Sequence, residues 1–133
     1  MGLLVFSGWF TVRWGVADML AQQGYEEMDR WNDRNPVTED RWQFALQRLT
    51  GAADLDPGNP VYQQRLSRLY RIRMTRLHAT SEFKRDPEFA LQHIRRSLEL
   101  RSRWGFSWVE LAYLKWLLRE KDAEFQAALT HAV

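Results

Sequence analysis

Apolar residues recur along most of the chain at the spacing of an α-helix. In 42–53 they return every three or four positions, which places them on one helix face. The same spacing appears in 60–77 and 89–100, and 107–119 is apolar on nearly every side, which favours a central helix. No segment shows the sustained apolar and polar alternation of a half-buried strand. The pattern therefore predicts an all-α fold.

The predicted helices have recognisable ends. Thr38 is a favoured N-cap residue, and the acidic residues after it suit the positive end of a helix. Asn59 and Asp86 are each followed by proline, whose missing N–H breaks no hydrogen bond in the first turn. Asp122 is the cap of a last helix. We expect a helix over 22–34 that continues from the N-terminal segment and ends before Pro36. Further helices are expected over 39–55, 60–77, 87–100, 107–119 and 123–129, with a linker at 78–85.

The N-terminal segment is a candidate membrane anchor. Residues 2–12 carry no charge, and 2–20 contains only Arg13 and Asp18 as charges, close to the roughly 20 apolar residues that a spanning helix needs. No basic segment precedes this run, so we do not expect a cleaved signal peptide. The alternative is a first helix buried in this domain or in a partner. The expected anchor covers 1–21, with lipid contacts from Leu3, Leu4, Val5, Phe6, Trp9, Phe10 and Trp14.

The chain contains an internal repeat with an offset of 45 residues. Residues 44–57 align with 89–102 without a gap, so that Phe-Ala-Leu-Gln recurs, and Leu66 and Leu69 then align with Leu111 and Leu114. Each unit is a helix, a short turn and a second helix. Such a pair cannot bury its apolar face alone, so we expect it to stack on its neighbours as a solenoid.

The repeated segments resemble the tetratricopeptide repeat (TPR) family. The resemblance implies a TPR-like α-solenoid of about two and a half helical hairpins over 22–133, preceded by the apolar N-terminal helix. The 45-residue offset exceeds the family's usual period of about 34, and we place the excess in 78–86 and in an extended second helix. The matching residues are Ala45-Leu46, Ala53, Leu55-Asp56-Pro57, Asn59-Pro60, Leu66, Tyr70, Ala90-Leu91, Leu98, Leu100, Leu111 and Ala112.

A narrower resemblance covers the apolar N-terminus and the strings LDPGNPVYQQRLSRLYRIR and SWVELAYLKWLLREKDAEFQAAL. These are similar to small membrane-anchored TPR proteins of bacterial exopolysaccharide-biosynthesis clusters, the VpsP-like family. The resemblance implies a bacterial inner-membrane protein, single-pass or peripheral, with a periplasmic repeat domain. It also implies an accessory role in exopolysaccharide biosynthesis or export, with protein partners of an envelope assembly. Members of that family continue past the third repeat, which implies a shortened chain here.

The charge is distributed unevenly between two halves. Residues 1–57 carry 5 Arg or Lys against 9 Asp or Glu, whereas 58–133 carry 14 against 8. A basic half can face nucleic acid, anionic lipid, a polysaccharide or an acidic partner, although solvated or internally paired arginines explain it without any partner. The predicted partner-binding residues are Arg65, Arg68, Arg73, Arg76, Lys115, Trp104 and Trp108.

The chain lacks the patterns that mark catalytic or cofactor sites. It has no Cys, and its three His residues are not spaced as metal ligands. Neither a nucleophile elbow nor a glycine-rich phosphate loop occurs. We therefore expect a non-enzymatic membrane-anchored adaptor without cofactor or metal. The alternatives are an accessory subunit of another integral membrane complex and a basic protein that binds nucleic acid or another polyanion.

Two cations fall on apolar helix faces. At 100° per residue, Arg73 lies among Leu66, Leu69 and Leu77, and Lys115 likewise lies among apolar residues. We expect each to meet a carboxylate across a helix interface, or else to extend its head to solvent. The candidate acids are Glu110, Asp122 and Glu124, with Asp54 and Asp56 as alternatives. The predicted core is Trp42, Leu46, Leu49, Tyr62, Leu66, Leu69, Leu91, Ile94, Trp108, Leu111 and Ala112.

Overall fold

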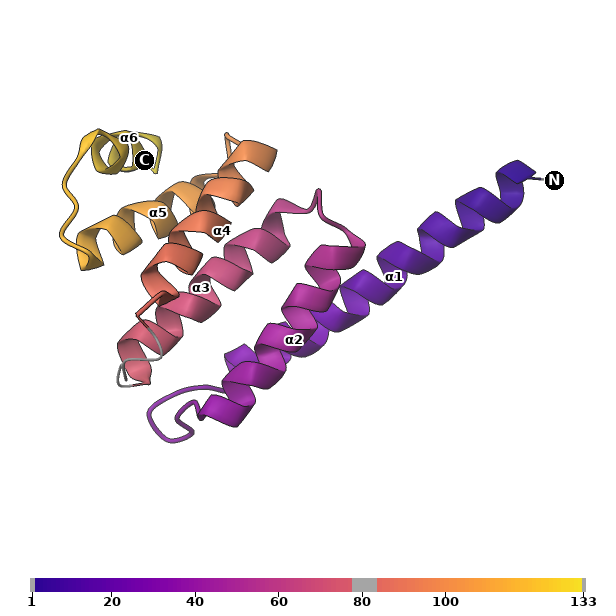
Figure 1. The fold of residues 1–133 in the computed structure, drawn as a ribbon, viewed down its shortest axis with the longest axis horizontal. Coiled ribbons are helices and arrows are strands. Elements are labelled where there is room, and N and C mark those ends of the chain that lie inside the picture. Colours follow the sequence, from indigo (N-terminus) through magenta and orange to yellow (C-terminus); the bar gives the residue numbers. More distant parts are fainter. Residues whose placement is uncertain (1, 78–83, 133) are drawn as a thin grey trace. The chain divides into compact units, whose positions relative to one another are not determined.

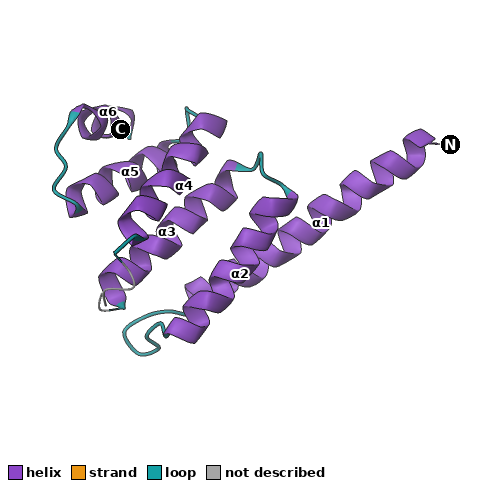
Figure 2. Cartoon of the chain, in the orientation of Figure 1, coloured by secondary structure: helices purple, strands orange, loops and turns teal. Residues whose placement is uncertain are grey.

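The described residues form helices joined by loops. The computed structural model describes residues 2–77 and 84–132, with side chains of the first helix from residue 8 onward. Its helices are α1 (Gly2–Asp29), α2 (Glu39–Leu55), α3 (Pro60–Arg76), α4 (Asp86–Leu100), α5 (Gly105–Leu117) and α6 (Ala123–His131) (Figure 1). No strand occurs among the described residues, as Figure 2 shows. The predicted all-α fold is confirmed, and most of the predicted linker, 78–83, lies outside the described residues.

Two of the four predicted caps, those at Thr38 and Asp122, are confirmed. The cap role of Asn59, directly before α3, stays a prediction. The Thr38 hydroxyl accepts a hydrogen bond from the Arg41 N–H at 3.4 Å, and an Asp122 carboxylate oxygen accepts one from the Phe125 N–H at 3.0 Å. The prediction was wrong at Asp86. This residue begins α4 without capping it, because its carboxylate binds Arg73 instead. The Asp-Pro pattern thus predicted the helix start but not the role of the side chain.

The chain divides into two compact units, 1–59 and 60–133, each with its own core. In the first unit α1 packs against α2, and in the second α3 packs against α4, while α5 packs against α6 and α4. The expected hairpins joined helices across the short turns, but the closest pair of the second unit is α3 with α4. Small residues explain this pairing: Ser67 and Ala90 are fully buried, and the Ser67 hydroxyl donates to the Ala90 carbonyl at 2.8 Å.

Small side chains also let α1 approach α2. Ala17, Ala21 and Gly24 lie on one side of α1, and a Cβ at Gly24 would stand 2.9 Å from the Leu49 Cγ. The helix continues past the expected anchor boundary at residue 21 and ends at Asp29. One side of α1 from Ala17 onward therefore belongs to the core of this unit, whereas the N-terminal part of the helix extends beyond the end of α2 (Figure 1).

The repeat identified in the sequence has matching burial in the structure. Ala45 and Ala90 are both 0% exposed, and the aligned pairs at offset 45 that follow them, Leu49 with Ile94, Leu66 with Leu111 and Leu69 with Leu114, are at most 2% exposed. Nine of the predicted core residues are buried, while Leu46 and Trp108 are half-buried. The α3–α6 core is Ala90, Leu91, Ile94, Leu98, Leu111, Ala112, Leu114 and Ala128, with Tyr70, Trp108 and Leu118 packed on it.

The prediction of a central helix over 107–119 was wrong. One side of α5 is buried through Ser107, Leu111 and Leu114, but its other side is open to solvent. The helix lies at the surface because α3, α4 and α6 cover only part of its circumference. Apolar composition on every side of α5 therefore leaves a set of large apolar side chains without a neighbouring helix in the described structure.

Candidate functional site

The open side of α5 presents a continuous apolar surface. Phe106, Val109, Tyr113 and Trp116 are 70, 51, 41 and 57% exposed, and they follow one another at i, i+3, i+7 and i+10. This spacing confines them to an arc of about 80° and a length of about 15 Å. We call these four residues the α5 face. A narrow apolar stripe along a helix is the kind of surface on which a second helix packs.

Neighbouring side chains hold the aromatic rings of the α5 face in place. Tyr113 and Trp116 stack with centroids 5.9 Å apart, and the Arg71 guanidinium carbon lies 4.8 Å from the Tyr113 centroid. Arg71 is itself fixed by Glu110, with one guanidinium nitrogen 3.3 Å from a carboxylate oxygen. Because these contacts already restrict the rotamers, a partner that binds here orders fewer side chains.

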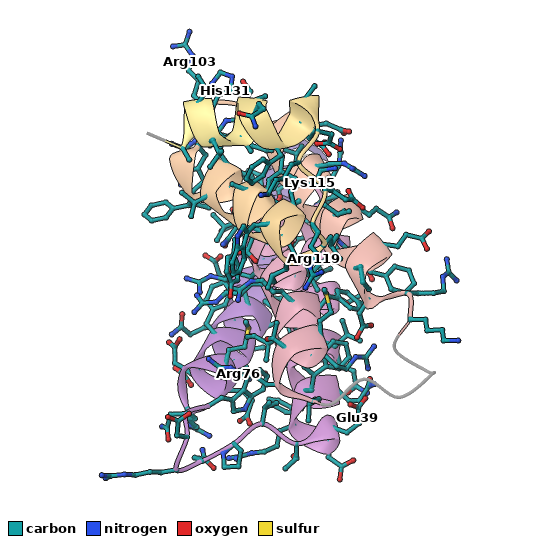
Figure 3. All side chains as sticks on the ribbon, turned by 90° about the vertical axis from the view of Figure 1, so that its left-hand side faces the viewer. Glu39, Arg76, Arg103, Lys115, Arg119 and His131 are labelled. Carbon is teal, nitrogen blue, oxygen red and sulfur yellow. The ribbon has the colours of Figure 1, made fainter. Side chains whose placement is uncertain are left out.

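Exposed cations flank both ends of the α5 face. Arg101 and Arg103 precede it, and Arg119 and Lys121 follow it. Figure 3 shows the Arg103 side chain extending away from the ribbon. A hollow of about 590 Å³ beside the second end is lined by Trp116, Leu117, Arg119 and Lys121.

The described acids of the second unit form ion pairs within that unit. Each described acid between residues 84 and 132 has a Lys or Arg nitrogen within 3.5 Å. These acids are Asp86, Glu88, Glu99, Glu110, Glu120, Asp122 and Glu124. The cations at the ends of the α5 face therefore leave a positive local charge around an apolar stripe.

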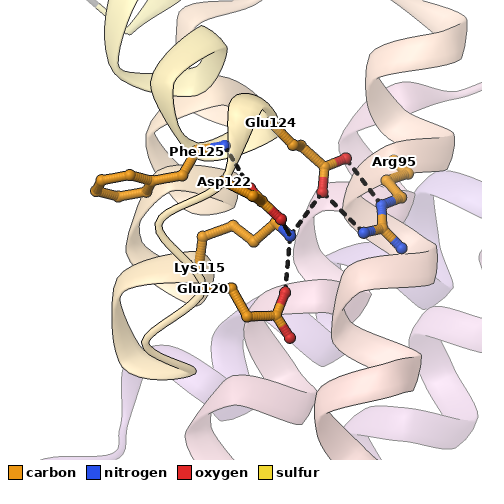
Figure 4. Close-up of polar contacts among 6 residues, drawn as sticks. All are labelled: Arg95, Lys115, Glu120, Asp122, Glu124 and Phe125. Atoms are coloured by element: carbon orange, nitrogen blue, oxygen red, sulfur yellow. Dashed lines mark hydrogen bonds and ion pairs between the residues drawn. The ribbon is translucent and has the colours of Figure 1, made fainter.

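A buried lysine fixes the segment that follows α5. The Lys115 side chain is 3% exposed, and its Nζ lies 2.7 Å from Glu120, 2.7 Å from Asp122 and 3.0 Å from Glu124 (Figure 4). Glu124 also accepts two hydrogen bonds from Arg95 of α4, at 2.8 and 3.0 Å. We call this group the Lys115 cluster. It joins α4, α5 and the start of α6.

The backbone aims one of these acids at the lysine. Arg119 has a φ of 58°, a left-handed conformation that ends α5. The Glu120 N–H then donates to the Lys115 carbonyl at 2.9 Å, the 6→1 bond of a Schellman motif. This turn returns the Glu120 side chain to Lys115, which explains why an acid five residues away is a partner.

The Lys115 cluster shifts the pKa values of its members. Burial lowers the pKa of Lys115, but hydrogen bonds to Asp122, Glu120 and Glu124 outweigh it and raise that pKa above its usual range. The Lys115 hydrogen bond lowers the pKa of Asp122, and the Arg95 hydrogen bond is the main cause that lowers the pKa of Glu124. Lys115, Asp122 and Glu124 are therefore charged at neutral pH.

The expected pairing of the two buried cations is confirmed, with partly different acids. Lys115 meets Asp122 and Glu124 as predicted, and also Glu120. The acid that Arg73 meets is neither Glu110 nor one of the alternatives, Asp54 and Asp56. The Arg73 guanidinium instead holds Asp86 by two hydrogen bonds of 2.9 and 2.8 Å, while Glu110 pairs with Arg71.

The other predicted partner-binding residues are dispersed in the structure. Arg68 and Arg76 are exposed on α3, and Arg65 is half-buried. Trp104 caps the start of α5 and meets Phe106 edge-on at 6.1 Å. Trp108 stacks on His131, with the two ring centroids 4.5 Å apart. Of this set, Trp104 adjoins the α5 face through its contact with Phe106. The sequence analysis missed the α5 face because it placed 107–119 at the centre of the fold.

Between residues 9 and 19, α1 carries a second exposed apolar stripe. Trp9, Val12, Val16 and Met19 are 65, 61, 38 and 53% exposed and share the i, i+3, i+7, i+10 spacing. We call them the α1 face. Phe10 and Trp14 contact each other, with ring centroids 6.1 Å apart, and Trp14 lies on another side of the helix.

The structure bears in part on the expected anchor. The side chains of Leu3, Leu4, Val5 and Phe6 lie outside the described residues. Arg13, the charge within the apolar run, donates from its Nε to the Leu55 carbonyl at the end of α2. Among the residues that the structure describes, none of the helices has both the length and the hydropathy to cross a bilayer.

The comparisons with known proteins do not assign a family. A scan against protein-family models gave no match, and a search of curated proteins found no relative. Within the described parts of the chain, no three His, Asp or Glu residues are grouped so as to hold a metal ion. The arguments for function therefore rest on the two exposed faces.

Proposed function

We propose that this protein is a non-enzymatic helical adaptor that binds another protein through its second unit. The α5 face is the observation that carries this proposal. Four large apolar side chains remain exposed on a helix whose other side is packed. The rings of Tyr113 and Trp116 stack on each other, and Arg71 lies over the Tyr113 ring. Solvated apolar stripes of this kind typically mark interaction sites.

A TPR-like solenoid is the architecture that we propose for the chain. It is supported by the sequence offset of 45 residues, by the matched burial of residues at that offset, and by sequential antiparallel helix pairs. Stacked helix pairs leave outer helix faces available for partners. The accessory role in bacterial exopolysaccharide biosynthesis or export, with a periplasmic repeat domain at the inner membrane, rests on the sequence resemblance.

We also propose that α1 attaches the protein to a membrane surface. The α1 face is exposed and includes Trp9. The nearby charge of Arg13 does not belong to this face, because its guanidinium donates to the Leu55 carbonyl at the end of α2. A helix with an exposed apolar stripe can lie in the plane of the interface, where tryptophan is favoured. This arrangement is the peripheral form of the expected anchor.

Two tryptophans on different sides of α1 test the membrane proposal. Trp9 belongs to the α1 face, whereas Trp14 is exposed on another side, at 65 and 56%. We expect Trp9→Ser to reduce co-sedimentation of the full chain with phospholipid vesicles several-fold, and Trp14→Ser to have little effect. Equal losses in both variants would show that the helix inserts with all sides in lipid, and no binding by the parent chain would refute the proposal.

The adaptor proposal is tested by capture from detergent-solubilised membranes. The immobilised full chain is compared with the double variant Phe106→Ser/Trp116→Ser and with Leu129→Ser, an exposed apolar control on α6. We expect specific partners to be captured by the parent chain and the control, and to be lost with the double variant. If all three chains capture the same proteins, the α5 face is not the binding site.

A further inference from the structure

We propose that the α5 face binds an acidic amphipathic helix of a partner protein. This inference rests on the adaptor function and specifies the chemistry of the partner. It combines the apolar stripe of Phe106, Val109, Tyr113 and Trp116 with the cations at its two ends.

The shape of the face selects a helix. An arc of about 80° over about 15 Å matches the apolar stripe of a partner helix of three turns, whose anchors recur every three or four residues. The outer side of α5 is a convex helix surface, with no strand edge in the described structure that an extended peptide could extend. A second helix can pack along it by placing its side chains between those of α5.

The charges select an acidic partner. Arg101 and Arg103 stand before the stripe, and Arg119 and Lys121 stand after it. The described acids of this unit already have cation partners inside the unit, so none of them is left over to neutralise the cations at the ends of the stripe. Acidic residues near both ends of the partner helix would meet these cations and favour association through electrostatic attraction.

The packing of α5 disfavours a lipid surface as the occupant. A helix that enters a membrane interface sinks about 5–10 Å and usually carries cations along its polar sides. The sides of α5 are instead occupied by α3, α4 and α6, and Lys115 is buried among the acids of its cluster. The cations lie at the ends of the stripe, which fits a partner of limited length.

The test uses a synthetic helix as the probe. We would label a peptide of about 16 residues that has leucine at every third or fourth position and glutamate near both ends. Its binding to the full chain is measured by fluorescence anisotropy, beside a peptide with the same leucines and lysine in place of glutamate. We expect the acidic peptide to bind at least about tenfold more tightly than the basic one, and added salt to weaken its binding.

Variants of the chain assign this binding to the α5 face. Phe106→Ser/Trp116→Ser should weaken the acidic peptide at least about tenfold, and Leu129→Ser should not. Arg119→Glu/Lys121→Glu should shift the preference toward the basic peptide, while Arg34→Ser, at an exposed arginine of the first unit, should leave it unchanged. Unchanged helical circular dichroism and thermal unfolding would show that each variant is folded.

Three results would overturn the inference. One is a binding pattern that does not depend on the proposed features. The acidic and basic peptides would then bind equally well, or Leu129→Ser would weaken binding of the acidic peptide as much as Phe106→Ser/Trp116→Ser does. Another is that the chain binds anionic vesicles and not the peptide, and that this binding requires Phe106 and Trp116. The occupant of the α5 face would then be a membrane surface. The third is self-association of the chain that the same double variant abolishes, which would identify a second copy. If the peptide fails but membrane partners still require the α5 face, the adaptor function stands without this partner.

Discussion

At the scale of single residues, the unusual feature is the number of charges inside the second unit. Arg73 is 9% exposed and Asp86 1%, and the two form a bidentate pair between α3 and α4. A buried pair of this kind adds little net stability, because both ions give up water. Removing one member is costly, since the other is left charged and without a partner.

Replacement of Arg73 should therefore destabilise the protein strongly. Arg73→Met retains much of the side-chain volume but strands the Asp86 carboxylate, and we expect it to lower the free energy of unfolding by about 3–5 kcal/mol. Arg76→Met, at an exposed position on the same helix, should change it by less than about 0.5 kcal/mol. Urea unfolding measures both. Similar small effects in the two variants would mean that the Arg73–Asp86 contact does not restrain α3 and α4.

The Lys115 cluster predicts a specific response to acid. The pKa values of Asp122 and Glu124 are lowered in the folded protein, so their contribution to stability is present above their unfolded values, near 4, and is lost as the pH falls through the lowered folded values. We therefore expect the parent chain to exceed Lys115→Met in stability by a constant amount above about pH 5 and by less below pH 4.

A neighbouring lysine provides the control for this pH dependence. Lys121 is exposed, and Lys121→Met should follow the parent chain at every pH, as measured by thermal unfolding from acid to neutral buffer. The opposite limit lies at high pH. Since the pKa of Lys115 is raised above its ordinary value of 10.5, the stability that its charge contributes is lost only as the pH rises beyond that value. A difference between parent and Lys115→Met that stays constant from acid to neutral pH contradicts the assignment.

At the scale of helices, close approach decides the packing of α1 on α2. A Cβ at Gly24 would stand 2.9 Å from the Leu49 Cγ and 3.2 Å from its Cδ2, and Leu49 is fully buried. Gly15, on the same helix, has nothing within 4 Å of the position that a Cβ would occupy. Both glycines are helical, but only at Gly24 would a methyl group collide with a neighbouring side chain.

Alanine at these two positions should have opposite effects. Alanine favours a helix over glycine by up to about 1 kcal/mol, so Gly15→Ala should stabilise the first unit slightly. Gly24→Ala gains the same preference but forces Leu49 to move in a packed core, and we expect a net destabilisation of about 1–3 kcal/mol. Thermal unfolding of the two variants compares the signs directly. If both raise the midpoint, α1 does not approach α2 closely at Gly24.

At the scale of the whole chain, the division into two units carries its own prediction. The second unit has a core drawn from α3–α6 and keeps its ion pairs within 60–133. We expect a chain of residues 60–133 to remain helical and to unfold cooperatively, with the modest stability typical of so small a domain. Circular dichroism during heating measures this, and a fragment that is largely unfolded at low temperature would show that the second unit requires the first.

The sequence predicted the helices and the buried charges better than their partners. Asp122 and Glu124 were identified because they begin the helix that follows Lys115. Glu120 was missed because the left-handed backbone of Arg119 directs it back to Lys115. Such a conformation is usually predicted from a glycine, and this position is an arginine. Asp86 was missed as the partner of Arg73 because Asp-Pro also predicts a helix cap. Arg73 and Asp86 come together because α3 pairs with α4. The sequence pattern instead favoured pairs of helices joined by the short turns, so this contact was not expected.

The sequence by itself determined the all-α fold, the limits of most helices and which side of α2, α3 and α4 is buried. These features follow from caps, prolines and apolar spacing, which act within one or two helical turns. The tertiary structure decided which helices pair, which acid each buried cation meets and which side of α5 stays open. An apolar residue has the same periodicity whether it meets the core or solvent, so the α5 face becomes visible only once α3, α4 and α6 occupy the remaining sides of that helix.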